Sequence, residues 1–196
     1  MKITEHLPAR LVETVRSLLS DERWYHTLCV VEWCTKLAKR FELDWKKCAL
    51  VGLLHDMFRD TEVEKLVKMA RVYSVTPTRF ERAHPVLLHG KVAAEYAKRT
   101  LEIDEEMYMA IAFHSSGHPE LGGIGKALVV SDSVAKDREY EGVETLRCES
   151  LKDLNAAYIK VIAQKIIYAV ERRLYVLQET VETWNEYLER SDLCGI

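Results

Sequence analysis

The amino-acid sequence predicts an all-α protein in which the 196 residues form a single domain. Apolar residues recur at steps of three and four along most of the chain, which is the spacing of one face of an amphipathic helix. The chain contains only four prolines and eight glycines, so few positions interrupt a helix. A chain of this length buries one full hydrophobic core but has little room for a second. These observations predict a helical bundle.

The expected helices follow one another with short connections, and polar residues mark several of their starts. Asp44 and Asp104 each precede an apolar-periodic segment, where an N-cap side chain accepts a backbone hydrogen bond, and Asp60 could cap the segment that follows it. Pro85 stands where a first-turn proline is tolerated. The helices are expected over approximately residues 7–19, 22–40, 45–57, 61–72, 78–83, 85–100, 105–113 and 124–135, and from residue 151 onward.

Two stretches depart from this regular succession. The connection over residues 114–125 is long and glycine-rich, and no P-loop lysine motif follows it, so we interpret its glycines as loop flexibility rather than a phosphate cradle. Residues 151–190 alternate apolar and charged side chains, which predicts one long amphipathic helix or two consecutive ones. Their apolar face is expected to pack against the rest of the domain or, in part, to form a homodimer interface.

Composition and charge limit the classes of partner. The formal net charge of −3 gives no reason to expect binding to nucleic acid or to a membrane surface, whereas a small anionic ligand is compatible with it. No segment reaches the roughly 20 apolar residues of a membrane span, and the N-terminal MKITEHLPAR lacks the apolar core of a secretory signal. The five cysteines form no C-x-x-C pair and are typical of reduced thiols. We therefore expect a cytoplasmic protein.

Several strongly polar residues fall where the sequence predicts a buried helix face. The segment GLLHDMFRD places His55 and Asp56 at the end of an apolar run, where burial is costly unless each side chain finds a partner. The same conflict recurs on the apolar faces of other predicted helices, at His26, His89, His114 and Asp132. An ionised carboxylate on such a face needs a cation nearby. A structural hydrogen bond could satisfy any one of these groups, but one metal site would satisfy them all.

These six residues also indicate the kind of metal site. Facing helices can project rigid side chains into a shared interior. Nitrogen and oxygen ligands without a thiolate favour iron, manganese, nickel or zinc. Six ligands exceed the four of a closed tetrahedral zinc site, and two ions bridged by one carboxylate would use them efficiently. The sequence therefore predicts a dinuclear metal site between helices.

The order of these residues resembles that of the HD-domain metal-dependent phosphohydrolases, which take their name from an adjacent His-Asp pair. The resemblance is narrowest to the YqeK-type branch. It rests on the motifs RWYHTLCV (residues 23–30), GLLHDMFRD (52–60), LLHG (87–90), HSSG (114–117) and SDSVAKDR (131–138). Its motifs cover about residues 20–140, and the C-terminal helical segment, about 151–190, is similar in length and character. It implies one HD-type domain over residues 1–196.

The resemblance also implies an activity and a division of the ligands. The branch hydrolyses dinucleoside tetraphosphates symmetrically, notably diadenosine tetraphosphate to two ADP, at a dinuclear centre of divalent or mixed-valence ions that contains iron. One ion would be held by His26, His55, Asp56 and Asp132, and the second by His89, His114 and the bridging Asp56. Two such ions lower the pKa of a bridging water towards about 7 and clamp a phosphoryl oxygen, so a metal-activated hydroxide would attack the phosphate.

Candidate contacts to the substrate come from cationic residues of the same motifs. Arg59 and Arg138 are proposed for both catalysis and substrate binding, because a guanidinium grips phosphate oxygens bidentately. Arg23 and His118 are proposed as substrate contacts only. Residues 134–136 differ from the isoleucine, glutamate and proline usual in the branch, which leaves the substrate open. The alternatives are a phosphohydrolase of a nucleoside monophosphate or deoxynucleoside triphosphate, and a non-catalytic module that senses nucleotide or metal.

Overall fold

The computed structural model describes residues 4–190, and within this range every regular element is a helix, which confirms the all-α prediction. The elements in chain order are α1 (Ala9–Leu18), α2 (Asp21–Arg40), α3 (Trp45–Leu54), α4 (Val63–Val72), α5 (Arg79–Ala83), the 3-10 helix η1 (Pro85–Leu88), α6 (His89–Thr100), α7 (Glu105–Ala112), α8 (Gly123–Val134), α9 (Val143–Ser150), α10 (Leu154–Glu171) and α11 (Gln178–Arg190). Among these described helices, none has the length and apolar character needed to cross a membrane.

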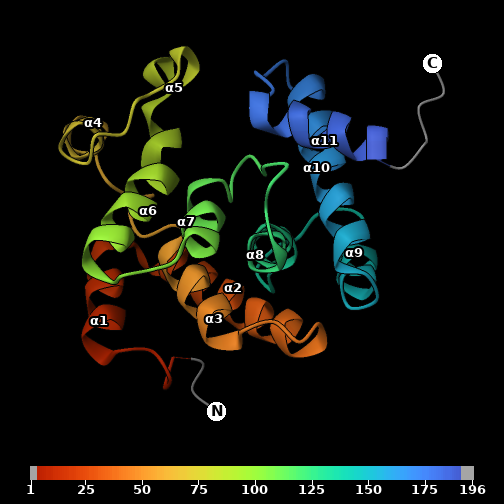
Figure 1. Ribbon diagram of the computed structural model, residues 1–196, viewed down its shortest axis with the longest axis horizontal. Helices are drawn as coiled ribbons and strands as arrows, with labels where there is room; N and C mark the ends of the chain where they lie inside the picture. Colours follow the sequence, from red (N-terminus) through yellow and green to blue (C-terminus); the bar gives the residue numbers. More distant parts are fainter. Residues whose placement is uncertain (1–3, 191–196) are drawn as a thin grey trace.

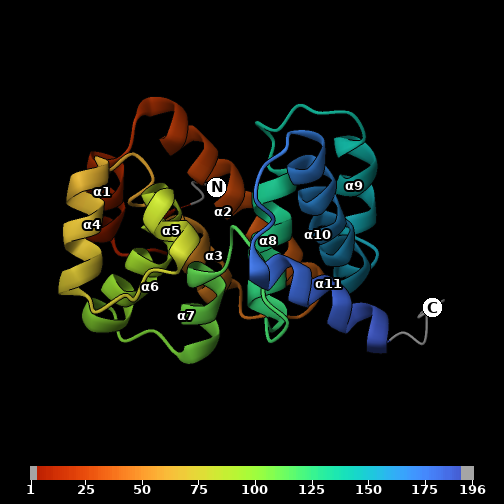
Figure 2. The ribbon, with the colours of Figure 1, turned by 90° about the horizontal axis from the view of Figure 1, so that it is seen from above.

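Helix α8 lies in the middle of the molecule, between two groups of helices (Figure 1). It packs against α2, α3 and α7 on one side and against α9 and α10 on the other. Helices α1, α4 and α6 complete the first group, whereas α11 packs on α10 in the second (Figures 1 and 2). One cluster of buried apolar side chains runs through both groups. Polar groups on the inner faces of α2, α3 and α8 therefore meet inside the bundle.

Local signals explain where several helices begin. Asp44 and Asp104 accept backbone hydrogen bonds at the starts of α3 and α7, as predicted. The cap predicted for Asp60 is wrong, because its Oδ2 accepts hydrogen bonds from the backbone amide and the hydroxyl of Ser20. The Ser20 hydroxyl in turn accepts the backbone N–H of Arg23 and so caps α2. Asp60 thus ties the segment before α4 to the start of α2.

Two of the differences from the expected helix boundaries place a histidine at a helix end. Helix α3 ends at Leu54, so His55 and Asp56 lie in the turn that follows it. The segment expected to form one helix over residues 85–100 divides into η1, with Pro85 in its first turn, and α6, which begins at His89. A side chain at a helix end can turn back toward the carbonyl groups of the preceding turn, which have no partner within the helix.

The C-terminal region forms two consecutive long helices rather than one. Helices α10 and α11 are separated by residues 172–177, where Arg173 has a φ of 55°. This left-handed conformation ends α10 and turns the chain. The connection reaches α5, where the ring of Tyr175 stacks on that of Phe80 with centroids 4.0 Å apart. Helix α9, over Val143–Ser150, has no counterpart in the sequence prediction.

The connection after α7 is packed rather than open. Ser116, Gly117 and Leu121 are buried, and Gly117 has a φ of 75°. A Cβ atom at Gly117 would collide with the side chains of Ile162 and Tyr158 on α10. The glycine is therefore required for a close approach in a left-handed conformation. The interpretation of this glycine as loop flexibility is wrong.

Candidate metal centre

Five helical elements bring the six predicted ligands to one place in the bundle. His26 lies on α2, His55 and Asp56 in the turn after α3, His89 at the start of α6, His114 just after α7, and Asp132 on α8. All are buried except Asp132, whose side chain is 16% exposed. Segments separated by as many as a hundred residues in the sequence thus contribute to one polar interior.

Asp56 stands at the centre of this group. Its Oδ1 lies 3.1 Å from Nε2 of His89 and 3.5 Å from Nε2 of His114. Its Oδ2 lies 3.5 Å from Nε2 of His55 and 2.9 Å from a guanidinium nitrogen of Arg23. Burial alone would raise the pKa of Asp56, but the histidines around it hold that pKa well below its usual range. The carboxylate is therefore ionised.

Backbone carbonyls set the orientation of three of the rings. Nδ1 of His55 lies 2.8 Å from the Gly52 oxygen, and His89 and His114 have the same contact with the carbonyls three residues before them, at 2.6 and 2.8 Å. A carbonyl oxygen only accepts, so Nδ1 donates and carries a proton in each ring. When such a ring is neutral, its Nε2 presents a lone pair to the centre. This arrangement is the one that metal-binding histidines adopt.

The protonation of these rings shows that the centre fits a cation. Burial lowers the pKa of His55 to about 4 and also lowers that of His89, so both rings are neutral at neutral pH. Nε2 of His89 nonetheless lies 3.1 Å from Nε2 of His114, and within residues 4–190 Nε2 of His55 has no hydrogen-bond partner. Two ring nitrogens and a carboxylate oxygen at these distances repel one another unless a shared proton or a metal ion lies between them. These donors fit divalent transition-metal ions.

The ligand atoms form two groups of three that share one residue. His26, His55 and Asp56 form the first group, and Asp56, His89 and His114 form the second, with the ligand atoms of each group within 4.8 Å of one another. Asp132 adjoins the first group, because its Oδ1 lies 3.0 Å from Nε2 of His26. The geometry thus supports two adjacent ions with Asp56 between them, which is the division that the resemblance implies.

His26 differs from the other three histidines, because carboxylates face both of its ring nitrogens. Oδ2 of Asp137 lies 2.8 Å from Nδ1, while Asp132 faces Nε2. Burial would lower the pKa of His26, but these two hydrogen bonds outweigh it and raise the pKa to about 9. The sequence analysis missed Asp137, which lies in the connection after α8. Its only sequence signal is a second aspartate five residues after Asp132 in the motif SDSVAKDR.

Small residues let the motifs approach closely enough to form the centre. A Cβ atom at Gly90 would lie 3.0 Å from the Ile111 oxygen and 3.1 Å from Cε1 of His114. A Cβ atom at Gly52 would lie 3.2 Å from the Cα of Val31 on α2. The glycines in LLHG and GLLHD therefore permit contacts between α6 and the end of α7 and between α3 and α2.

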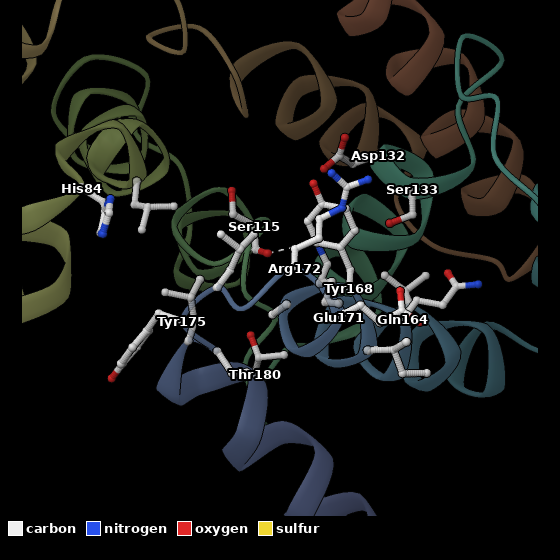
Figure 3. A pocket seen from close by; sticks show the side chains of 18 of the residues that line it. His84, Ser115, Asp132, Ser133, Gln164, Tyr168, Glu171, Arg172, Tyr175 and Thr180 are labelled. Carbon is white, nitrogen blue, oxygen red and sulfur yellow. Dashed lines mark hydrogen bonds between the residues drawn. The ribbon is translucent and has the colours of Figure 1, made fainter.

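A cavity of about 970 Å³ opens beside the centre, between the end of α8, helix α10 and the connection 172–177. Asp132 and Ser133 lie at one end of it, and His84 and Tyr175 lie at the other, with Ser115 between them (Figure 3). Its volume is in the range of about 300–1,000 Å³ typical of small-molecule sites. Asp132 belongs both to this cavity and to the polar centre, so a molecule in the cavity would lie beside the residues predicted to bind metal.

The four residues proposed as substrate contacts differ in whether they reach the cavity or the polar centre. Arg138 lines the cavity and donates to Oδ1 and to the backbone oxygen of Asp132, at 2.6 and 2.8 Å. Arg23 reaches the same centre through its ion pair with Asp56. Arg59 and His118 do not line the cavity. The ring of His118 packs against Phe113, and its Nδ1 accepts the backbone N–H of Glu120.

The chain is similar to known proteins of the HD domain family. The model of that family matches residues 23–162. The chain is 29% identical over 183 residues to a symmetrical bis(5'-nucleosyl)-tetraphosphatase of Halalkalibacterium halodurans, covering 91% of this chain and 96% of that protein. A protein of the same name from Bacillus subtilis is 30% identical over 174 residues, covering 87% of this chain and 92% of the relative.

A solved structure is also similar. It is the crystal structure of a predicted HD superfamily hydrolase involved in NAD metabolism from Clostridium acetobutylicum, with a TM-score of 0.87 and 26% sequence identity. The match covers 92% of this chain and 96% of that protein. The similar sequences and the similar structure therefore each match nearly the whole of this chain.

Proposed function

This chain belongs to the HD domain family, and from that premise we propose that it hydrolyses dinucleoside tetraphosphates symmetrically, converting diadenosine tetraphosphate into two ADP. One observation carries the metal-dependent part of the proposal. The Asp56 carboxylate lies between two groups of inward-facing histidine nitrogens. A cavity lined by Asp132 and Arg138 adjoins this centre and offers room for a nucleotide. The names of the relatives support the substrate class.

The proposed ligand sets follow the two groups of donors. His26, His55 and Asp56, with Asp132 beside them, would hold one ion, and Asp56, His89 and His114 would hold the other. We propose iron, with manganese, nickel or zinc as alternatives, because these metals accept imidazole and carboxylate ligands together. When bound, two such ions supply a nucleophile from water at neutral pH and neutralise charge on the phosphate.

The protein's own residues would orient these ligands and the substrate. The carbonyl oxygens behind His55, His89 and His114 hold each ring with Nε2 toward the centre. The guanidinium of Arg138 lines the cavity beside Asp132, where it can bind phosphate oxygens. Arg23, which is paired with Asp56, would offer a second guanidinium to the substrate.

Two further proposals concern residues that do not line the cavity. Arg59 is kept as a candidate for catalysis and substrate binding because it lies three residues after Asp56, and its backbone N–H donates to the backbone carbonyl oxygen of Asp56. His118 is kept as a candidate substrate contact that would require the ring to leave Phe113. The homodimer and the cytoplasmic location expected from the sequence stay predictions.

Product analysis tests the proposed reaction. The metal-loaded protein should convert diadenosine tetraphosphate into ADP as the only early product, and AMP, dATP and cyclic dinucleotides should react much more slowly. The appearance of AMP together with ATP would show that an outer phosphorus is attacked. Faster hydrolysis of AMP or dATP would favour the alternative phosphohydrolase. Tight nucleotide binding without turnover under several metals would favour the sensing module.

A further inference from the structure

A lysine of α10 reaches the edge of the metal centre. Nζ of Lys165 donates to the backbone oxygen of Ser115 at 2.9 Å. Ser115 directly follows His114, and its hydroxyl lies 3.0 Å from Nε2 of that histidine. The ammonium group is therefore next to a residue that itself contacts a proposed metal ligand. The sequence analysis did not select Lys165, because it falls within the amphipathic C-terminal stretch.

Lys165 also lines the cavity that Asp132 and Arg138 line. In the part of the chain that the structure describes, no carboxylate forms an ion pair with Nζ, although Asp132, Glu141 and Glu171 line the same cavity. Asp132 acts on the ammonium group through its charge without touching it. By contrast, Lys160, five residues earlier on the same helix, pairs with Glu149 at 2.6 Å.

A partly buried ammonium without a carboxylate partner is costly unless an anion reaches it. Burial and the nearby Arg138 lower the pKa of Lys165, and the charge of Asp132 only partly offsets them. The ammonium group has three donors, and Ser115 takes one of them. Two donors are left for groups that enter the cavity.

We propose that Lys165 binds a phosphate group of the substrate's polyphosphate chain, acting with Arg138 from the same cavity wall. This inference rests on the proposed function in that it takes this cavity as the place of the substrate. A charge-assisted hydrogen bond from lysine to phosphate is stronger than one between neutral groups. Lys165 would thereby hold the phosphate chain beside the metal ligands without being a ligand itself.

The test compares variants that separate the charge of Lys165 from its contact with Ser115. In Lys165→Gln the charge is lost, while the side chain keeps an amide donor that is one bond shorter than the ammonium group. Lys165→Arg keeps the charge, and Lys160→Gln is the matched control on the same helix. Binding of ADP and of adenosine to the metal-loaded proteins is measured by titration calorimetry, and metal content by elemental analysis.

The expected result is that Lys165→Gln weakens ADP binding about tenfold or more, as loss of a charged hydrogen bond predicts. Metal content and adenosine binding should be unchanged, Lys165→Arg should retain most of the affinity for ADP, and Lys160→Gln should match the unmodified protein. In steady-state assays the KM for diadenosine tetraphosphate should rise more than kcat falls.

Four outcomes would overturn the inference: ADP affinity unaffected in Lys165→Gln, an equal loss in Lys165→Arg, loss of metal in Lys165→Gln, or no ADP binding by the unmodified protein. The binding measurement does not depend on turnover. If diadenosine tetraphosphate is not cleaved but ADP binding depends on the Lys165 charge, the proposed function is wrong and Lys165 is a phosphate-binding residue for another nucleotide. If it is cleaved and Lys165→Gln binds ADP normally, only this inference is wrong.

Discussion

Oδ2 of Asp137 lies 2.8 Å from Nδ1 of His26, on the side of the ring that faces away from Asp132. A carboxylate in this position orients a metal-binding imidazole and increases its basicity. Asp137→Asn should therefore lower metal affinity by about 10- to 100-fold. Competition with a chromophoric chelator measures the affinity. Glu139→Gln, an exposed position in the same connection, is the control, and equal affinities for the two variants would show that Asp137 has no such role.

The shared position of Asp56 predicts how single ligand losses rank. Asp56→Ala removes a member of both donor groups, whereas His89→Ala removes a member of one. Asp56→Ala should retain less metal after purification than any single histidine variant. Its activity should also be lower, close to that of the metal-free protein. Elemental analysis after metal-supplemented expression gives the stoichiometry. The dinuclear site would be contradicted if the unmodified protein held less than about one ion per chain and its melting temperature did not respond to metal.

The two arginines proposed for catalysis should differ in effect. Arg138→Ala should keep the metal but reduce kcat/KM for diadenosine tetraphosphate by about tenfold or more, because Arg138 lines the cavity and contacts Asp132. Arg59→Ala should also keep the metal, with a smaller loss, since Arg59 does not line the cavity. Kinetics and elemental analysis on both variants check this. Loss of metal in both, or full activity in both, would show that the residues are misassigned.

The histidines predict a stability optimum for the metal-free protein. The pKa of His26 is raised to about 9, so the stability it contributes is complete below the unfolded histidine pKa of about 6.5 and is lost as the pH rises towards 9. The pKa of His55 is lowered to about 4, so its contribution is present above about 6.5 and is lost as the pH falls towards 4. Stability should therefore be greatest near pH 6.5.

Urea denaturation in the presence of a chelator, repeated over a range of pH values, measures this optimum. His26→Gln should remove most of the decline between pH 6.5 and 9, because it removes the group whose pKa is raised. A midpoint that stays constant across that range in the unmodified protein would contradict the assignment of a charged His26.

Alanine substitutions at two glycines with positive φ distinguish the effect of backbone strain from that of side-chain collision. Gly142 has a φ of 87° and open space around it, whereas a Cβ atom at Gly117 would also collide with Ile162 and Tyr158. Gly142→Ala should cost about 1 kcal/mol of unfolding free energy from strain alone. Gly117→Ala should cost about 1–3 kcal/mol more, as overpacking does. Denaturant unfolding measures both losses of unfolding free energy. Equal losses would mean that the connection 114–122 shifts to accommodate the Cβ atom without destabilising the protein.

The spacing of apolar residues was sufficient to predict most of the helices, α9 excepted, and the inward direction of His26, His89, His114 and Asp132, because helical periodicity is a local property. The conflict between charge and burial at His55 and Asp56 was equally visible in the sequence, since the cost of burying a polar group depends on its chemistry. The sequence by itself therefore determined the helical class and which buried polar residues required a partner.

Only the tertiary structure decided how these residues meet and which others join them. The path of the connection after α8 brings Asp137 to His26, and the packing of α10 brings Lys165 to Ser115, across 111 and 50 residues of sequence. The same packing leaves Arg59 and His118 outside the cavity. Contacts of this kind depend on how helices pack and where connections run, and side-chain periodicity within one segment does not encode either.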